Sequence, residues 1–206
     1  GNISWFSTKY SPSVIARAAL IAWLSGVAVK IAESQYFRPV EAHSGEIMIR
    51  KATAADVPAV LGLVRVLADY ERAPHEVTLT EAQMQADVHV GHFDAWLAWT
   101  PDRQPVGLVL CHRRYSTWKG LTAHLEDLVV LESFRGHGLG RRLLEVAVVW
   151  ARSIGAHRLH WEVLDWNQPA IDFYEGLGAE LNRDWIPCRL AGDALTNFEL
   201  RYPPEL

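Results

Sequence analysis

The chain has 206 residues, of which 50% are apolar and 21% are charged, an ordinary composition for a globular protein. Its formal net charge of −4 gives no electrostatic reason to bind nucleic acid or an anionic membrane, so we expect neither as a partner. The two cysteines, Cys111 and Cys188, lie far apart in the sequence. They indicate no disulfide framework and fit a reducing compartment, so we expect a cytoplasmic protein.

The first 45 residues differ from the rest and are expected to be an extension. Residues 14–33 form an apolar helical pattern, whose uncharged centre at 18–29 is shorter than the roughly 20 residues that span a bilayer. A signal-peptide core has a similar length. We favour an extra helix that packs on the body or on a partner chain, or an extension without function. A linker over 35–46 follows, so we expect an extension over 1–45 and one main domain over 46–206.

The main domain is predicted to begin with a short strand and two helices. Ile47, Met48 and Ile49 form the strand. Apolar residues at helical spacing then predict a helix over 55–72. Thr80 and Gln83 have the spacing of a capping box, which predicts the start of a second, short helix.

Three strands and a strongly amphipathic helix are expected next. Strands over 93–99 and 106–115 flank a turn and form a hairpin. After a loop at 116–120, a long strand is expected over 121–131. The helix that follows it, over 138–154, carries its apolar residues on one face.

The last part of the chain is predicted to complete a mixed sheet. A strand over 158–164 is parallel to the strand at 121–131, because a helix separates the two. Asn167 begins another helix, and closing strands are expected at 184–190 and 197–202. The order βααβββαβαββ predicts an α/β (α+β) fold.

The most informative segment is a glycine-rich turn between the long strand and the amphipathic helix. It has the spacing Gly136-x-Gly138-x-Gly140, which is neither the dinucleotide-binding Gly-x-Gly-x-x-Gly nor the P-loop Gly-Lys-Ser/Thr. Glycines let backbone N–H groups converge, and a helix N-terminus adds its positive dipole end. The turn therefore predicts a pyrophosphate site, although a plain tight turn with surface arginines is the alternative.

The turn resembles the signature Arg/Gln-x-x-Gly-x-Gly/Ala of the GNAT acetyltransferase superfamily, which Arg135, Gly138 and Gly140 match. Further blocks resemble the spermidine/spermine (diamine) and thialysine acetyltransferase branch of that superfamily. The blocks are Asp69-Tyr70-Glu71, Trp118-Lys119-Gly120, Leu125-Glu126-Asp127 and Asp165-Trp166-Asn167-Gln168-Pro169-Ala170-Ile171-Asp172-Phe173-Tyr174. The resemblance covers about residues 47–202, so the domain expected over 46–206 is a GNAT domain.

The resemblance implies a strongly bent mixed sheet whose parallel strands splay apart at a bulge, with acetyl-CoA as cosubstrate in the gap. Main-chain groups of the long strand would hold the pantetheine arm, and the turn would hold the pyrophosphate. The implied cofactor-binding residues are Leu128, Val129, Val130, Arg135, Gly136, His137, Gly138, Leu139, Gly140, Arg141, Asn167 and Ala170.

The implied enzyme is an N-acetyltransferase that acylates a small primary amine by direct attack on the thioester. Only roughly one amine in a thousand is neutral at pH 7, so a general base helps. Glu126 is our candidate base, acting through water, since an unpaired carboxylate in mid-strand is costly unless it faces a cleft. Tyr174 is the candidate acid, and the backbone N–H of Leu128 would polarise the carbonyl. A structural role stays open for both side chains.

Two neighbours of Glu126 on the same strand are also considered. Asp127 alternates to the opposite face of the strand, and we expect it to be structural. His124 shares the face of Glu126 and would be placed to relay a proton, but an ordinary hydrogen-bonded strand histidine is the alternative.

For the amine, the resemblance implies binding by Tyr70, Glu71, Trp118 and Glu126, with a contribution from a second subunit and hence a homodimer. Asp184 is a further candidate for substrate binding. Arg72 follows Glu71 where polyamine enzymes are more acidic. A long polycation would be repelled there, so a shorter amine or an amino-acid side-chain amine is favoured.

No metal is expected from the histidine pairs that the sequence presents. His157 and His160 are assigned to opposite faces of a strand, and His89 and His92 lack a partner at ligand spacing. Two other functions remain open. One is a non-catalytic acyl-CoA-binding regulatory module, and the other is acetylation of a protein or peptide amine.

Overall fold

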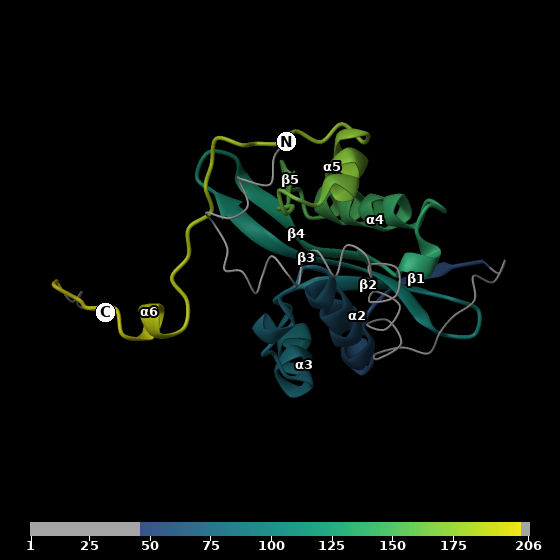
Figure 1. The fold of residues 1–206 in the computed structure, drawn as a ribbon, viewed down its shortest axis with the longest axis horizontal. Coiled ribbons are helices and arrows are strands. Elements are labelled where there is room, and N and C mark those ends of the chain that lie inside the picture. The colour runs from purple at the N-terminus through teal and green to yellow at the C-terminus, as the bar shows by residue number, and fades with distance from the viewer. Residues whose placement is uncertain (1–45, 203–206) are drawn as a thin grey trace, which may run out of the picture. The chain divides into compact units, whose positions relative to one another are not determined.

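The computed structural model describes residues 46–202, which fall into two compact units divided between Glu162 and Val163. The first unit contains a five-stranded sheet in the order β1-β2-β3-β4-β5 (Figure 1). Neighbouring strands are antiparallel except for β4 and β5, which are parallel. The strands are β1 Met48–Lys51, β2 Asp94–Trp99, β3 Pro105–Ser116, β4 Gly120–Val130 and β5 Leu159–His160. The expected mixed sheet is therefore confirmed.

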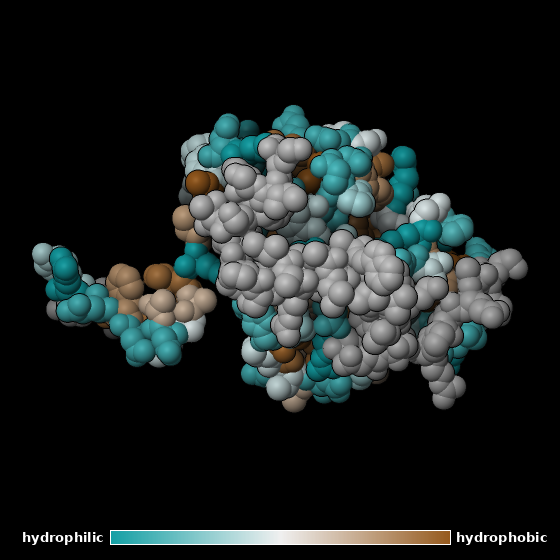
Figure 2. All heavy atoms as spheres, in the orientation of Figure 1, coloured by the Kyte–Doolittle hydropathy of each residue, from teal (hydrophilic) through white to brown (hydrophobic). Residues whose placement is uncertain are grey.

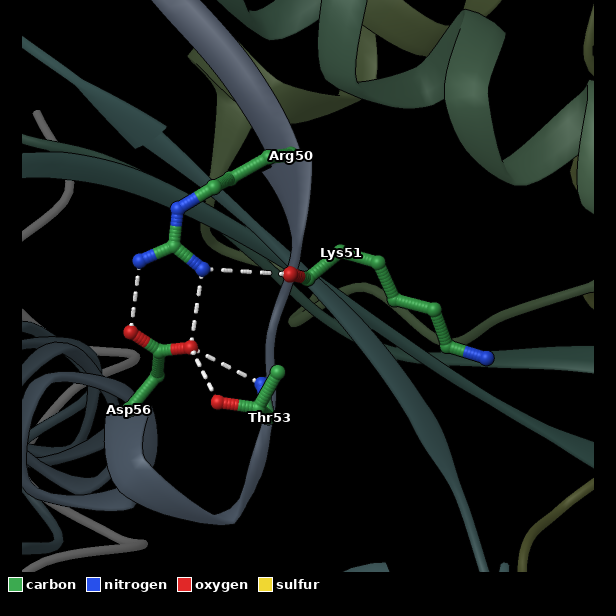
Figure 3. Close-up of polar contacts among 4 residues, drawn as sticks. All are labelled: Arg50, Lys51, Thr53 and Asp56. Carbon is green, nitrogen blue, oxygen red and sulfur yellow. Dashed lines mark hydrogen bonds and ion pairs between the residues drawn. The ribbon is translucent and has the colours of Figure 1, made fainter.

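A closed polar cluster joins β1 to the first helix (Figure 3). Arg50 donates to both carboxylate oxygens of Asp56 at 2.7 and 2.8 Å, and the N–H and hydroxyl of Thr53 donate to Asp56 Oδ2 at 2.9 and 2.8 Å. These bonds, led by the one from Arg50, hold the pKa of Asp56 well below its usual range. The predicted helix is confirmed as a 3₁₀ turn, η2 Ala54–Asp56, followed by α2 Val57–Tyr70.

The helices cover the sheet on both sides: Figure 1 shows α2 and α3 on one side of the strands and α4 on the other. α3, Glu81–Val90, begins at the predicted capping box, in which Gln83 N–H donates to Thr80 Oγ1 at 3.3 Å. α4, Leu139–Ser153, buries the predicted apolar face. The core side chains of α2 and α4 include Val57, Val60, Leu61, Leu63, Leu143, Ala147 and Trp150.

The hairpin of β3 and β4 contains a bulge where the candidate base lies. Leu110 pairs with Asp127 and Cys111 pairs with Leu125, so Glu126 is the extra residue on β4. A bulge bends its strand and redirects the side chain of the extra residue. The sequence alternation that predicted Glu126 in mid-strand did not locate this irregularity, but the resemblance did imply a bulge.

The parallel strands separate as the resemblance implies. β5 pairs with β4 only at Ala123↔Leu159 and His124↔His160, just before the bulge. The strand predicted over 158–164 is therefore wrong beyond residue 160, because the bent β4 no longer offers a straight ladder to its parallel neighbour. Residues 125–130 of β4 thus lie on the part of the strand that β5 does not pair with.

The second unit contains two short helices, α5 Gln168–Glu175 and α6 Asp193–Thr196. The start of α5 at Asn167 is confirmed. The closing strands predicted at 184–190 and 197–202 are wrong, because within 163–202 these segments find no partner ladder. Their apolar pattern is instead exposed, and Figure 2 shows brown and tan spheres gathered around α6. The exposed side chains include Trp185, Ile186, Leu190, Leu195, Phe198 and Leu200.

The N-terminal predictions are not tested by the structure. The helix expected over 14–33, and the linker over 35–46 apart from its last residue, lie outside the described residues. Within 46–202, none of the helices combines the length and apolar character needed to cross a bilayer.

Candidate active site

Three carboxyl groups gather around the bulge of β4 and the end of α2. Glu126 has 55% of its side chain exposed, whereas Asp127 is largely shielded. Burial, followed by the nearby charges of Glu126 and Glu71, raises the pKa of Asp127 to about 7. Burial also raises the pKa of Glu71, which follows the last residue of α2. The structure therefore brings Glu71 and Glu126 close enough to Asp127 to act on its charge, and their binding of an amine stays a prediction.

A row of histidines lies beside Glu126. His112 and His124 are directly paired across β3 and β4, and their ring centroids are 4.9 Å apart. The Nε2 atoms of His112 and His124 lie 3.2 and 3.4 Å from Glu126 Oε2. His124 Nδ1 lies 3.2 Å from His160 Nδ1 on β5. The expected proximity of His124 to Glu126 is confirmed, but its role in proton relay stays a prediction.

His112 is the neighbour of Glu126 that sequence reasoning missed. Its side chain lies on β3, fourteen positions before Glu126, and only the hairpin register brings it to the cluster. The sequence did carry a signal for His112. In a hairpin whose loop is centred on residue 118, His112 and His124 are equally far from the centre and therefore pair. Burial lowers the pKa values of both His124 and His160, so these two rings favour their neutral forms.

The glycine turn leads from β4 into α4 and has the geometry of an anion site. Gly136 and Gly138 both have φ of 79°, in the left-handed region that favours glycine, and a Cβ on either would meet nothing within 4 Å. The first bond from the turn into α4 runs from Arg142 N–H to Gly138 O at 3.1 Å. The preceding N–H groups, of Leu139, Gly140 and Arg141, therefore have no acceptor inside the helix. Open backbone donors at a helix N-terminus are suited to hold a phosphate pair.

The arginines of the turn have their own contacts. Arg135 Nε donates to Val130 O at 2.9 Å, and its guanidinium lies 5.3 Å from the ring centroid of Tyr70. Arg141 forms an exposed ion pair with Glu145 at 3.0 Å. The candidate residues Tyr70 and Arg135 are thus brought together, and His137 Nδ1 lies 2.8 Å from Arg135 O. Arg135 thus braces the turn, whereas Arg141 pairs along α4.

Trp118 lies at the opposite end of β4 from the turn. It is exposed and lines a depression of about 460 Å³ with Lys119, His157 and Arg158. Glu126 lies six positions after Gly120, which is roughly 20 Å along the strand. The structure therefore does not bring Trp118 to Glu126 within one chain. The basic residues around Trp118 are also unfavourable for an ammonium ion.

The second unit contains the remaining candidates. Asn167 precedes α5, and its carbonyl oxygen accepts from the N–H groups of Ala170 and Ile171, each at 3.0 Å. Ile171 and Tyr174 are the buried residues of α5. Asp184 is exposed, and its N–H donates to Asn182 Oδ1 at 3.1 Å. The roles predicted for Asn167, Ala170, Tyr174 and Asp184 stay predictions.

The first unit combines a glycine turn with the geometry of an anion site, a β4 segment that β5 leaves unpaired and an acidic bulge on the same strand. Such an unpaired edge can bond an extended amide-containing arm, and the turn can bond a pyrophosphate. This fold and arrangement suit an acyltransferase that uses a coenzyme A thioester.

Comparison with known proteins gives the family. Residues 61–179 match the acetyltransferase (GNAT) family. The chain belongs to this family, whose members use acetyl-CoA, and it is an N-acetyltransferase.

Individual relatives agree with this assignment. The chain is 34% identical over 161 residues to thialysine N-epsilon-acetyltransferase of Bos taurus, covering 72% of this chain and 95% of that protein. It is 28% identical over 194 residues to an L-ornithine N5-acetyltransferase of Arabidopsis thaliana, covering 71% and 85%. The fold is similar to a solved aminoglycoside N-acetyltransferase in complex with CoA, with a TM-score of 0.58 and 18% identity over 73% of this chain and 98% of that one.

Proposed function

We propose that this enzyme transfers the acetyl group of acetyl-CoA to the primary amine of a small molecule, with an amino-acid side-chain amine or a short diamine as acceptor. The observation that carries the proposal is the carboxyl cluster at the β4 bulge, on the strand that leads into the glycine turn. Relatives named for thialysine and L-ornithine, both amino acids with a side-chain amine, support this acceptor class.

The cosubstrate is proposed to be held mainly by backbone groups. Main-chain groups of Leu128, Val129 and Val130 lie on the part of β4 that β5 leaves unpaired, where they would bond the pantetheine amides. The N–H groups between Gly136 and Arg141 would bind the pyrophosphate. Asn167 and Ala170 would border the same arm. When bound, acetyl-CoA supplies the activated acyl carbon, and the Leu128 N–H would stabilise charge on its carbonyl oxygen.

Proton transfer is proposed to use Glu126 and Tyr174. Glu126 is exposed enough to reach a water molecule and lies where the bulge redirects its side chain. It would take the proton of the attacking amine through that water. Tyr174 would give its phenolic proton, or a hydrogen bond, to the departing thiolate, since a phenol is protonated at neutral pH.

The acidic cluster is proposed to select a cationic amine. Glu71, Glu126 and Asp127 together produce negative potential that attracts an ammonium group. Tyr70, next to Glu71, would border the amine, and Asp184 would contribute from the second unit. Arg72 follows directly and adopts a left-handed φ of 64°. Its positive charge disfavours a long polyamine.

We also propose a homodimer in a reducing compartment such as the cytoplasm. Contiguous exposed apolar side chains commonly mark an interaction site, and those around α6 are of this kind. Trp118, remote from Glu126 in its own chain, would contribute to the site of a partner subunit. The two cysteines are free, as expected where thiols stay reduced. Light scattering coupled to size exclusion would give twice the chain mass, and a monomeric mass would contradict the dimer.

The test of function is an acceptor screen. Purified protein is incubated with acetyl-CoA and one of a panel of amines: thialysine, ornithine, short diamines, spermidine, and peptides with a free lysine. Free thiol is measured together with the mass of the product. We expect an increase of 42 Da on a small amine with stoichiometric thiol release. Binding of acetyl-CoA without thiol release would indicate a regulatory module, and acetylation of peptides alone would indicate a protein acetyltransferase.

A further inference from the structure

The contacts of the Nδ1 atoms of His112 and His124 indicate which ring nitrogen of each histidine carries the proton. His112 Nδ1 lies 3.1 Å from the carbonyl oxygen of Arg113, which can only accept, so Nδ1 carries the proton. In a neutral imidazole the second nitrogen then carries a lone pair. That nitrogen, His112 Nε2, faces Glu126 Oε2 at 3.2 Å.

The same reasoning applies to His124. Arg114 Nη1 lies 3.4 Å from His160 Nδ1, and a guanidinium can only donate, so His160 Nδ1 is the acceptor. We therefore assign His124 Nδ1, 3.2 Å from that atom, as the donor in their hydrogen bond. This leaves the lone pair of His124 on Nε2, which faces Glu126 Oε2 at 3.4 Å. In their neutral forms the two rings thus direct two lone pairs toward one carboxylate oxygen, an arrangement that a bound cation would stabilise.

The spacing fits a metal ion. A tetrahedral ion with bonds of about 2.0–2.1 Å separates neighbouring ligand atoms by about 3.3–3.4 Å. The two edges from Glu126 Oε2, at 3.2 and 3.4 Å, match this separation. One ligand atom from each of His112, His124 and Glu126 lies within 4.8 Å of the others. The remaining edge joins the ligand atoms of His112 and His124, and a rotation of the partly exposed His112 ring would close it.

The surroundings resemble those of metal ligands in other proteins. A ligating histidine almost always donates its other N–H to a carbonyl or a second group, which fixes the ring. Arg113 O and His160 Nδ1 serve this purpose here. Two histidines and a carboxylate leave a fourth position for water, and Glu126 and His112 are open to solvent with 55% and 33% of their side chains exposed. The strands of a paired hairpin hold the ligands more precisely than loops would.

We propose that His112, His124 and Glu126 form a site for a divalent late first-row metal ion such as Zn²⁺, and that an ion bound there reversibly inhibits acetyl transfer. Bonds form from two imidazole nitrogens and one carboxylate oxygen to the ion, which releases bound waters. With its carboxylate engaged, Glu126 cannot accept the proton of the amine. The ion also repels a cationic acceptor. The inhibition rests on the proposed role of Glu126, but the metal site itself does not.

Metal binding is tested without any assay of activity. The full chain, treated with EDTA and desalted, is titrated with Zn²⁺ in competition with a fluorescent chelator, and with Co²⁺ to record the visible absorption of a tetrahedral site. We expect one site whose affinity falls at least tenfold in His112→Phe, His124→Phe and Glu126→Gln. The matched control is His89→Gln, an exposed histidine on α3, which should bind as the wild type does. No binding, or binding that these three substitutions leave unchanged, overturns the site.

Inhibition is tested separately, with the amine acceptor that gives the highest rate. We expect Zn²⁺ to suppress acetyl transfer, EDTA to restore it, and His112→Phe to need at least tenfold more Zn²⁺ for half inhibition, relative to its own metal-free rate. Circular dichroism checks that each variant is folded, and His112→Gln replaces a variant that is not. Zinc bound at the cluster without inhibition overturns the regulatory step. An enzyme that binds zinc as expected but transfers no acetyl group leaves the metal site standing and overturns the proposed function.

Discussion

Asp56 and Asp127 are both largely shielded from water in the first unit, but their surroundings shift their pKa values in opposite directions. Asp56 accepts hydrogen bonds from the Arg50 guanidinium and from Thr53, which lower its pKa (Figure 3). Asp127 is affected by burial and by the charges of Glu126 and Glu71, all of which raise its pKa. One carboxylate is neutralised by its partner, and the other is crowded by charges of its own sign.

The difference separates a region that holds the fold together from a region suited to chemistry. Around Asp56, positive and negative groups match, so the charge stabilises the junction of β1 and α2. Around Asp127, negative charge accumulates at a bulge, at some cost to stability. Strongly perturbed pKa values of this kind cluster at functional sites. The following substitutions test whether the two regions can be separated experimentally.

The largest expected effect is on turnover in Glu126→Gln. Loss of the base should lower kcat by about 100- to 10,000-fold, while the free energy of unfolding changes by less than about 0.5 kcal/mol because the side chain is half exposed. Steady-state kinetics and urea unfolding measure both quantities in EDTA. Glu81→Gln, in the exposed first turn of α3, is the matched control. A kcat within threefold of the wild type would remove Glu126 from proton transfer.

The second largest effect on kcat is expected in Tyr174→Phe, a substitution in the second unit. Loss of the phenolic proton should lower kcat by about 10- to 1,000-fold, with little change in the affinity for acetyl-CoA. Calorimetric titration of acetyl-CoA and kinetics with the best acceptor separate the two effects. Phe173→Leu, beside it on α5, changes an aromatic ring without a hydroxyl and controls for packing. Equal losses in both variants would favour a packing role for Tyr174.

The third prediction concerns the other carboxylate. Asp56→Asn should lower the free energy of unfolding by about 2 kcal/mol at pH 7, because it removes a bidentate pair with Arg50 and a bond to Thr53. A depressed pKa contributes stability above the pKa of the unfolded state, so the deficit should shrink as the pH falls below about 4. Urea unfolding at both pH values measures it. Arg50→Gln should give a similar loss, and the double variant less than the sum of the two.

Asp56→Asn should affect stability but not turnover. The folded fraction of this variant should keep the wild-type kcat, since the cluster of Arg50, Thr53 and Asp56 lies at the junction of β1 and α2. A large fall in kcat at temperatures where the variant is folded would contradict the separation of the two regions.

The sequence predicted the sheet, α2, α3, α4 and the glycine turn because each depends on local patterns. Periodic apolar residues, one capping box and left-handed glycines are all readable within a few positions. The closing strands at 184–190 and 197–202 were predicted from the same kind of pattern, but a strand also needs a partner. Within 163–202 none is present, so the apolar residues there are exposed.

The candidate site could be predicted only in part, because some of its contacts join segments that are distant in the sequence. Glu126, Glu71 and the turn were found from motifs along the chain. His112 joins them through the antiparallel register, which is a property of two strands, and the bulge at Glu126 is a departure from regular alternation. The environment of Asp127 depends on Glu71 at the end of α2, more than fifty positions earlier in the chain. Alternation alone predicted a structural Asp127 and gave no sign of this crowding.

The smallest expected effect has the opposite sign. Asp127→Asn should raise the free energy of unfolding by about 1 kcal/mol at pH 8, because a neutral amide replaces a desolvated carboxylate near two others. A raised pKa means that the folded protein binds the proton more tightly, so the wild type gains stability as the pH falls from about 7 to 4. The advantage of the variant should therefore vanish near pH 4. Urea unfolding in EDTA at pH 8 and 4 measures this difference. If Asp127→Asn is less stable than the wild type at pH 8, a favourable partner holds this carboxylate, and the contrast with Asp56 is lost.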